Sequence, residues 1–222
     1  MLVLHSSPDS ASMAPRIVIE DLGLPYSARV VDRAGGELAS PGYRALHPLG
    51  KIPVLETPQG PMFETAAILL WLADTHAPGR LAPAPGSADR GAFLTWFFFT
   101  STNLHPNVLD LFYPDRVAGP EAIAALLPRA ATRTRAALDA LETAARTLPA
   151  VLPADRLSIL GIYVGMLLRW LAQMPDGHAG LARAAEWPAL AAAAAACETT
   201  PAARRVAEAE GLGPTIFTNP DR

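Results

Sequence analysis

The segment Ala45–Asp74 reads A-L-H-P-L-G-K-I-P-V-L-E-T-P-Q-G-P-M-F-E-T-A-A-I-L-L-W-L-A-D, and it predicts two strands followed by a buried helix. Ile52–Leu55 is an apolar run bounded by Gly50 and by Pro58-Gln59-Gly60, a pattern typical of antiparallel strands joined by a turn. The run after Glu64-Thr65 is apolar on most sides, so its helix must be buried over most of its surface.

Two residues of this segment suggest a ligand site. Pro53 stands at the head of a strand, where a proline donates no hydrogen bond to the sheet. If the Ile52–Pro53 bond is cis, which is a minority form of such bonds, the backbone of Ile52 turns outward and can pair with an extended ligand. Glu64 lies where the free N–H groups and the positive dipole end of the next helix point. Simple helix capping is the alternative interpretation of Glu64.

These motifs resemble the glutathione-binding half of the glutathione S-transferase family. The family pattern is N-P-x-G-K-[VI]-P-x-L followed by E-[ST]-x-A-I, and this chain has H-P-L-G-K-I-P-V-L at 47–55 and E-T-A-A-I at 64–68. His47 in place of Asn is a departure. The resemblance implies that Glu64 pairs with the α-ammonium of glutathione and that Thr65 binds its α-carboxylate.

The resemblance also assigns roles to the residues around Pro53. It implies that the backbone of Ile52, next to Pro53, pairs with the cysteinyl amide of glutathione. Lys51 is expected near the glycyl carboxylate, although a lone surface lysine is usually only solvated. Lys51, Ile52, Pro53, Glu64 and Thr65 are therefore the predicted glutathione-binding residues.

Composition limits the class of protein. The 222 residues allow one or two domains, and a net charge of −3 with a pI near 5.9 shows no nucleic-acid footprint. Cys197 is the only cysteine, which excludes an internal disulfide, suits a reducing cytosol and leaves no zinc motif. The N-terminus shows neither the charged region nor the long apolar region typical of a signal peptide, and Arg169 ends the apolar run 161–168 well short of a membrane span. We therefore expect a cytoplasmic protein with no metal, no nucleic-acid partner and no membrane partner.

The order of elements predicts an α/β domain followed by an all-α domain. Met1–Leu4 and 28–31 read as strands, residues 5–11 as a polar turn, and a helix begins near Ser12; this is the order of a thioredoxin-like fold. Residues 77–87 are rich in proline and glycine and predict a linker. The domains are then 1–76, a thioredoxin-like glutathione-binding domain, and 88–222, an all-helical C-terminal bundle.

Helical patterns fill the second domain. Helices are expected over 88–112, 120–147, 155–174, from Pro188 through the alanine run, and from Pro201 to Gly211. The segment D-R-L-S-I at 155–159 resembles the D-x-x-S-x-A-D start of the family's central helix. Ser158 can cap this helix, but Gly161 replaces the reciprocal Asp. Gly161 and Gly165 lie one turn apart and favour close approach of a neighbouring helix.

The N-terminal loop carries the predicted catalytic residues. The stretch S-P-D-S-A-S-M-A-P-R-I at 7–17 resembles S-P-G-A-C-S-x-A-P-x-I of bacterial beta-type transferases. Ala11 stands at their cysteine and Ser6 at a tyrosine, so a hydroxyl must activate the thiol if any group does. Ser12 matches the serine after the cysteine and is the first candidate, with helix N-capping as its alternative role. Ser10 is the second candidate.

A histidine completes the predicted catalytic set. His105 lies in T-N-L-H, which resembles an E-L-H segment whose histidine faces the active-site cleft in beta-type enzymes. A structural or solvated histidine is the alternative interpretation. Cys197 lies in an alanine-rich helix and is expected to be buried and inert.

The resemblance implies a cytoplasmic detoxification enzyme. We expect a homodimeric glutathione transferase in which glutathione, the co-substrate, attacks a small hydrophobic electrophile as its thiolate. A glutathione-binding or scaffold protein without turnover is one alternative. The other is a glutathione-dependent reductase or dehalogenase relative, although the missing active-site cysteine argues against a mixed disulfide with the protein.

Overall fold

The computed structural model describes residues 1–221, and its N-terminal part is built on one four-stranded sheet. The strands are β1 (Leu2–Ser6), β2 (Tyr26–Val30), β3 (Val54–Thr57) and β4 (Gly60–Phe63), in the order β2-β1-β3-β4. β1 runs parallel to β2, whereas β3 is antiparallel to both of its neighbours. The expected thioredoxin-like arrangement is confirmed.

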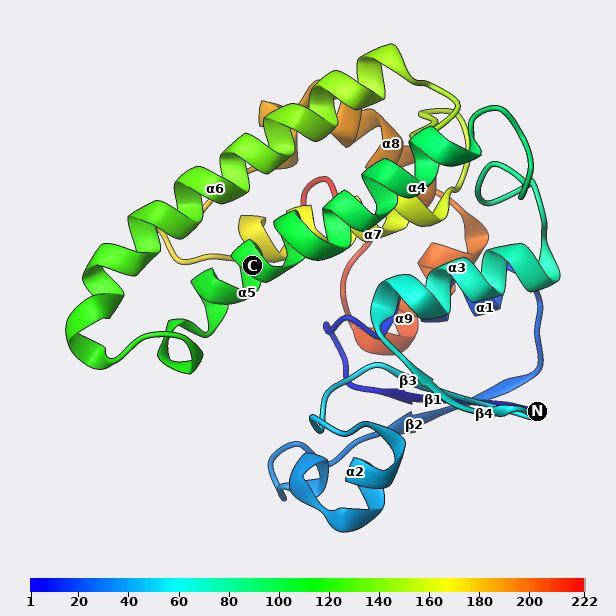
Figure 1. Ribbon diagram of the computed structural model, residues 1–222, viewed down its shortest axis with the longest axis horizontal. Coiled ribbons are helices and arrows are strands. Elements are labelled where there is room, and N and C mark those ends of the chain that lie inside the picture. Colours follow the sequence, from blue (N-terminus) through cyan, green and yellow to red (C-terminus); the bar gives the residue numbers. More distant parts are fainter. Residues whose placement is uncertain (222) are drawn as a thin grey trace.

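Helices cover both faces of this sheet (Figure 1). Helices α1 (Met13–Asp21) and α3 (Thr65–His76) lie on one face, and the short α2 (Pro41–Leu46) lies on the other. Successive strand residues point to opposite faces, so Leu55 joins the main core while Val54 packs with Tyr43 of α2. Helix α3 is buried on the side that faces the core, through Ile68, Leu69 and Leu72, whereas Leu70 and Trp71 are half-buried and Ala67 is exposed. The expected burial over most of this helix is therefore wrong within the single chain.

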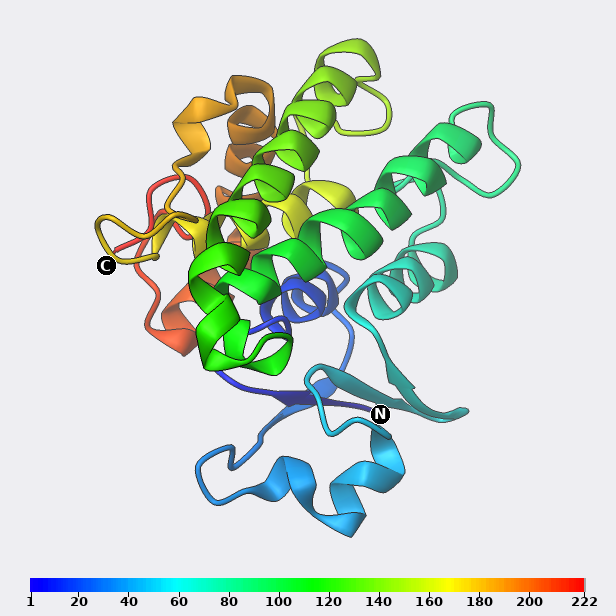
Figure 2. The same cartoon turned by 60° about the vertical axis from the view of Figure 1, so that its left-hand side comes forward.

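The rest of the chain is helical and lies over the α1–α3 layer (Figure 2). Its helices are α4 (Arg90–Phe99), α5 (His105–Phe112), α6 (Pro120–Thr147), α7 (Ile159–Ala172), α8 (Pro188–Glu198) and α9 (Pro201–Glu210). One turn of π-helix, Thr100–Leu104, joins α4 to α5 without a break. The predicted α/β plus all-α class is confirmed.

Helix α7 runs through the centre of the helical part, and every one of its residues is buried. Ser158 caps it, because its Oγ accepts the N–H of Gly161 at 3.1 Å. A β-carbon on Gly161 would lie 2.9 Å from Sγ of Cys197 in α8. One on Gly165 would lie 2.8 Å from the ring of Phe217. Both glycines therefore allow close packing, as the sequence predicted.

The structure differs from the sequence prediction at the end of the first strand. β1 continues through His5 and Ser6, which were expected in the turn, because both side chains are buried beside β2 and β3. Residues 77–89 contain neither helix nor strand, where the linker was expected. The boundary at 77–87 stays a prediction, because the buried core runs without interruption from Leu4 and Ile17 into α7.

Candidate active site

A cavity of about 690 Å³ opens between the sheet part of the chain and helices α5 and α7. Four segments line it: the loop after β1, the segment before β3, the start of α3, and the facing sides of α5 and α7. All five predicted glutathione-binding residues, together with Ser10 and His105, are in its lining; Ser12 is not. The cavity therefore joins motifs that lie up to a hundred residues apart in the sequence.

The segment before β3 presents its backbone to the cavity. The Ile52–Pro53 bond is cis. The N–H and C=O of Ile52 bond to no other residue within 1–221, so both are available to an extended ligand. The carbonyl of Lys51 instead accepts the hydroxyl of Tyr43 at 3.0 Å, which fixes this segment on α2.

His47 stabilises the turn that precedes this segment through a side-chain hydrogen bond. Its side chain is buried, and its Nδ1 accepts the N–H of Leu49 at 3.1 Å. An asparagine carbonyl, which the family pattern has here, is also an acceptor, so His47 can replace it in this turn. Burial lowers the pKa of His47, which keeps the imidazole in the neutral form that can accept this bond.

Glu64 and Thr65 lie where β4 leads into α3. Glu64 has a φ of +72°, a conformation that costs a non-glycine residue roughly 1–3 kcal/mol and that often marks a ligand site. Its carboxylate caps no helix N–H and has no partner among the residues the structure describes, so the capping interpretation is wrong. The hydroxyl of buried Thr65 is likewise free of protein partners in that part of the chain. An acid and a hydroxyl thus converge on one end of the cavity, beside the free N–H groups of α3.

The loop after β1 holds a cluster of two hydroxyls. Ser10 Oγ lies 2.7 Å from the carbonyl oxygen of Ser7 and 2.8 Å from Ser12 Oγ. Ser12 is fully buried, and its hydroxyl also exchanges bonds of 3.2 Å with the carbonyl and N–H of Ser7. Ser10 therefore lines the cavity, and the buried Ser12 hydroxyl holds the Ser10 hydroxyl in place by a hydrogen bond.

The expected N-cap at Ser12 is wrong. Its backbone is already helical, with φ −71° and ψ −20°, and its side chain accepts no helix N–H. The Ser12 hydroxyl instead forms hydrogen bonds with Ser7 and Ser10. The neighbouring Ala11 lines the cavity, and its N–H makes no hydrogen bond with the described residues, which adds a backbone donor at the place of the family's cysteine.

The same loop is fixed by a charge pair that spans the chain. Asp9 has a left-handed φ of +51°, and its carboxylate accepts two hydrogen bonds, of 2.8 and 2.9 Å, from the buried guanidinium of Arg169 in α7. The N–H of Asp9 donates to Glu210 of α9 at 3.0 Å. Gln173, in the amide orientation that its neighbours favour, bridges Asp9 and Arg169. The loop that carries Ser10 is therefore held by the helical half.

His105 lies across the cavity at the end of the π-helical turn. Its Nδ1 is 2.8 Å from the hydroxyl of Tyr163 in α7, and Ser101 also lines the cavity. Burial, with Lys51 as a second cause, lowers the pKa of His105 to about 4. Burial raises the pKa of Tyr163 well above its ordinary value. Both groups are therefore neutral at pH 7.

Charges around the cavity favour an anion. Arg33, Lys51 and Arg116 line it, and none of the three forms an ion pair with a described residue. Of the two lining acids, Asp9 is neutralised by Arg169, and only Glu64 is unpaired. A thiolate placed between these groups meets a positive field.

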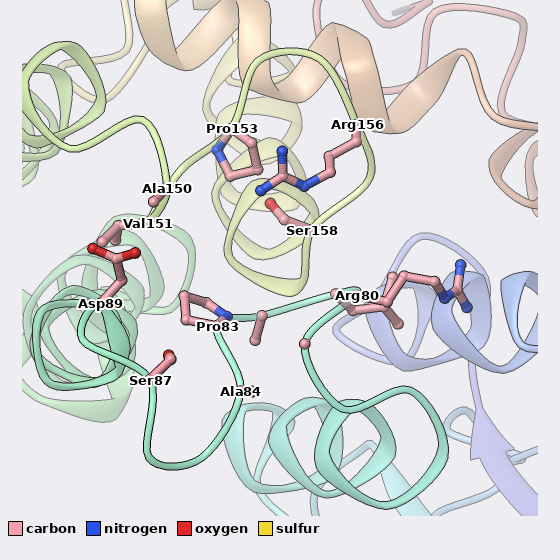
Figure 3. Close-up of a pocket in the computed structure, with 13 residues that line it drawn as sticks. Arg80, Pro83, Ala84, Ser87, Asp89, Ala150, Val151, Pro153, Arg156 and Ser158 are labelled. Carbon is pink, nitrogen blue, oxygen red and sulfur yellow. The ribbon is translucent and has the colours of Figure 1, made fainter.

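A second hollow, of about 280 Å³, lies between the segment after α3 and the α6–α7 loop (Figure 3). Its charged side chains include Arg80 and Arg156, which pair with Asp21 and Asp155 on the surface. Its other polar side chains include Ser87 and Asp89, which are exposed to solvent, and none of the predicted glutathione-binding residues lines it. The larger cavity is therefore the candidate active site.

The only cysteine of the chain lies outside the cavity lining. Cys197 is fully buried, as the sequence predicts, and burial raises its pKa to about 12, which keeps the thiol protonated. Within residues 1–221 no three metal-ligating side chains gather, and no helix is long and apolar enough to cross a membrane.

The sequence did not reveal Asp9, Arg169, Ser101 or Tyr163 as parts of the site. Arg169 had a usable signal, because it is the only charged residue in an otherwise apolar helix. A buried charge requires a partner, but the pattern could not say which acid supplies it.

Comparisons with known proteins agree with this geometry. Residues 10–75 match the family model described as glutathione S-transferase, N-terminal domain. A glutathione S-transferase of Xanthomonas campestris is 34% identical over 109 residues, which are 49% of this chain and 52% of that protein. The chain thus spans about half the length of the curated transferases that it matches, and 27–34% of the matched plant elongation factor 1-gamma proteins.

Solved structures extend the similarity over nearly the whole chain. A sphingomonad glutathione S-transferase complexed with glutathione is 32% identical, with a TM-score of 0.73 over 95% of this chain and 100% of that chain. A bacterial beta class transferase of Sphingomonas chungbukensis is 27% identical, with a TM-score of 0.75 over the same shares of the two chains. With motif, cavity and relatives in agreement, this chain is a bacterial-type member of the glutathione S-transferase family.

Proposed function

We propose that the chain is a glutathione transferase that conjugates the glutathione thiolate to small apolar electrophiles. The observation that carries the proposal is the convergence of unpaired polar groups on one cavity. The carboxylate of Glu64, the hydroxyl of Thr65 and the backbone of Ile52 match, in that order, the α-ammonium, the α-carboxylate and the cysteinyl amide of the tripeptide. Lys51 then lies near the glycyl carboxylate.

This placement directs the thiol toward Ser10 and Ala11. A free thiol has a pKa of about 8.5, so ionisation near pH 6.5 requires roughly 2.7 kcal/mol of preference for the thiolate. One hydroxyl bond to the charged sulfur supplies about 1.5–3 kcal/mol. The N–H of Ala11 and the unpaired cations add to it. The chain therefore has enough donors without a cysteine or a tyrosine.

Ser10 is the group that we propose to donate to the sulfur, and Ser12 supports it. When Ser10 turns its proton from the Ser7 carbonyl to the thiolate, Ser12, 3.2 Å from that carbonyl, can replace it as the donor. The order of the two candidates is thus the reverse of the order that the motif alone favours.

Titration of bound glutathione by its thiolate ultraviolet absorbance tests this assignment. Ser10→Ala is expected to raise the pKa of the bound thiol by at least about one unit, equal to roughly 1.4 kcal/mol, with little loss of affinity. Ser12→Ala is expected to raise it by less. An unchanged pKa in Ser10→Ala together with a raised one in Ser12→Ala would return the role to Ser12, and no change in either would remove hydroxyl activation.

The other half of the cavity is proposed to hold the electrophile. Leu109, Phe112 and Trp170 give it an apolar wall, beside His105. We further propose a cytoplasmic, two-fold homodimer, the commonest closed assembly of soluble proteins. Exposed Phe63 and Phe98, with 37% and 46% of their surfaces accessible, suit an interface. Light scattering at micromolar concentration should give twice the chain mass; the monomer mass would contradict this.

Glutathione binding without turnover is the second candidate. Ala11, at the position of the family's cysteine, favours it, because no thiol of the protein reaches the cavity. A chain that binds glutathione but leaves its thiol pKa near 8.5 would be of this kind. A reductase that forms a mixed disulfide with the protein is disfavoured by the burial of Cys197.

A further inference from the structure

Tyr163 fixes which nitrogen of His105 carries the proton. Tyr163 Oη and His105 Nδ1 lie 2.8 Å apart. Tyr163 is buried and its hydroxyl has no other acceptor among the described residues, so we assign it as the donor to Nδ1. The Tyr163–His105 bond therefore holds the His105 proton on Nε2.

The ring of His105 is also fixed in place. It packs edge-on against Tyr163, with ring centroids 5.6 Å apart, and against Trp170 at 5.7 Å. Nε2 bonds to no residue within 1–221, and His105 lines the cavity. The π-helical turn 100–104, a form frequent at functional sites, brings Ser101 and His105 to this wall.

We infer that His105 Nε2–H is an oxyanion donor that favours electrophiles in which attack builds negative charge on oxygen, above all α,β-unsaturated carbonyl compounds. A preorganised donor in a water-poor site is worth most where charge develops in the transition state. A neutral imidazole suits this role, because it donates without transferring its proton in the chemical step.

The reaction balances without a further reagent. The glutathione sulfur forms a bond to the β-carbon, and the C=C electron pair moves to the carbonyl oxygen, which becomes an enolate. His105 Nε2–H donates a hydrogen bond to that enolate oxygen. Water then protonates the α-carbon, which restores the carbonyl and completes the thioether. Displacement of chloride from a benzylic carbon builds no oxyanion and gains nothing from His105.

The test compares two electrophiles in the full-length protein, benzylideneacetone and benzyl chloride, with glutathione. His105→Leu is expected to lower kcat for benzylideneacetone by about 100-fold while changing benzyl chloride conjugation by less than about threefold. His105→Gln keeps an N–H donor and is expected to recover part of the loss. An equal loss for both electrophiles would overturn the inference.

Tyr163 is a positioning residue, and Tyr163→Phe tests its part. The variant is expected to lower kcat for benzylideneacetone by about tenfold with KM nearly unchanged, since one hydrogen bond of about 1.4 kcal/mol corresponds to tenfold. Tyr26→Phe loses a bonded hydroxyl outside the cavity and is the matched control. In nitrogen-15 NMR the His105 shifts should indicate the Nε2–H tautomer in the native chain and a mixture in Tyr163→Phe.

The inference depends on the proposed function, and the same experiment separates the two. Wild-type conjugation of both electrophiles with unaltered selectivity in Tyr163→Phe and His105→Leu would overturn the inference alone. An Nδ1–H tautomer in the native chain would do the same. Failure of the wild type to conjugate either electrophile would overturn the transferase proposal and the inference with it.

Discussion

His105 makes the stability of the protein sensitive to acid. Its pKa falls from an ordinary 6.5 to about 4 in the folded chain, so the unfolded chain binds more protons between these values. The free energy of unfolding therefore falls as the pH drops through this window and is unaffected by His105 above it. At pH 5 the loss is about 2 kcal/mol relative to pH 8.

Urea unfolding of the native chain and of His105→Gln at pH 5 and pH 8 measures the contribution of His105 to the free energy of unfolding. Other groups, such as buried His47, titrate in both proteins and cancel in the difference. The difference in the free energy of unfolding between the two proteins should change by about 2 kcal/mol in favour of His105→Gln when the pH is lowered from 8 to 5. A gap independent of pH would mean that His105 titrates normally.

Single residues also show what the sequence could and could not predict. Glu64, Thr65 and Ile52 were found because the motif fixes their spacing within 14 residues, and local geometry then places them together. Ser10 and Ser12 could not be ranked, because the path of a tight loop decides which hydroxyl reaches the cavity. Tyr163 was hidden in an apolar helix, where an aromatic residue is usually core.

Among the elements, α7 is packed too closely to accept a larger residue. A β-carbon on Gly165 would meet the Phe217 ring at 2.8 Å, so Gly165→Ala should destabilise the protein by roughly 1–3 kcal/mol despite a better helix propensity. Gly91 of α4 has no atom within 4 Å of the same β-carbon. Gly91→Ala should therefore stabilise by roughly 0.5–1 kcal/mol.

Chemical denaturation of Gly165→Ala and Gly91→Ala measures the change in the free energy of unfolding at each site. Opposite signs are expected from the same substitution, because only one site lacks room. If Gly165→Ala were as stable as Gly91→Ala, Phe217 would have to shift freely, and the close contact of the C-terminal segment with α7 would not matter.

The elements themselves were largely predictable. Proline marks the starts of α8 and α9, glycine marks the end of α9, and the apolar run marks α7 as central. The end of β1 was missed because His5 and Ser6 look polar, whereas His5 is buried in the sheet between Glu56 and Arg29. Polar side chains that find partners on neighbouring strands are invisible to a hydrophobic pattern.

At the scale of the whole molecule, the Asp9–Arg169 pair couples the catalytic loop to the helical half. Asp9→Asn leaves the buried guanidinium without its counter-charge and should cost about 3–5 kcal/mol. Arg169→Met removes the charge itself, and the double variant should recover part of the loss. The coupling in this double-mutant cycle is expected to exceed about 1 kcal/mol.

Thermal or denaturant unfolding of the four proteins gives the coupling energy. Strictly additive losses would show that the loop is held by other contacts. Glu198→Gln, another buried acid that lies outside the cavity, provides a comparison in which the partners are backbone N–H groups of 217 and 218 and the Thr218 hydroxyl. Its effect should be independent of Arg169→Met.

The joining of the two halves could not be predicted from the sequence alone. Asp9 and Arg169 are 160 residues apart, and no periodicity relates them. The halves themselves were predictable, because the strand-rich and alanine-rich parts differ in composition. The cavity forms only where the two halves meet. No local sequence pattern therefore marks the part of the cavity that is proposed to hold the electrophile.

The affinity for glutathione tests the central claim most directly. Calorimetric titration of the native chain, Glu64→Gln and Glu208→Gln compares the cavity acid with an exposed acid of α9. Loss of a charge-assisted bond of roughly 1.5–3 kcal/mol should weaken binding by about tenfold or more in Glu64→Gln and leave Glu208→Gln unchanged. Equal affinities in all three proteins would contradict the placement of glutathione in this cavity.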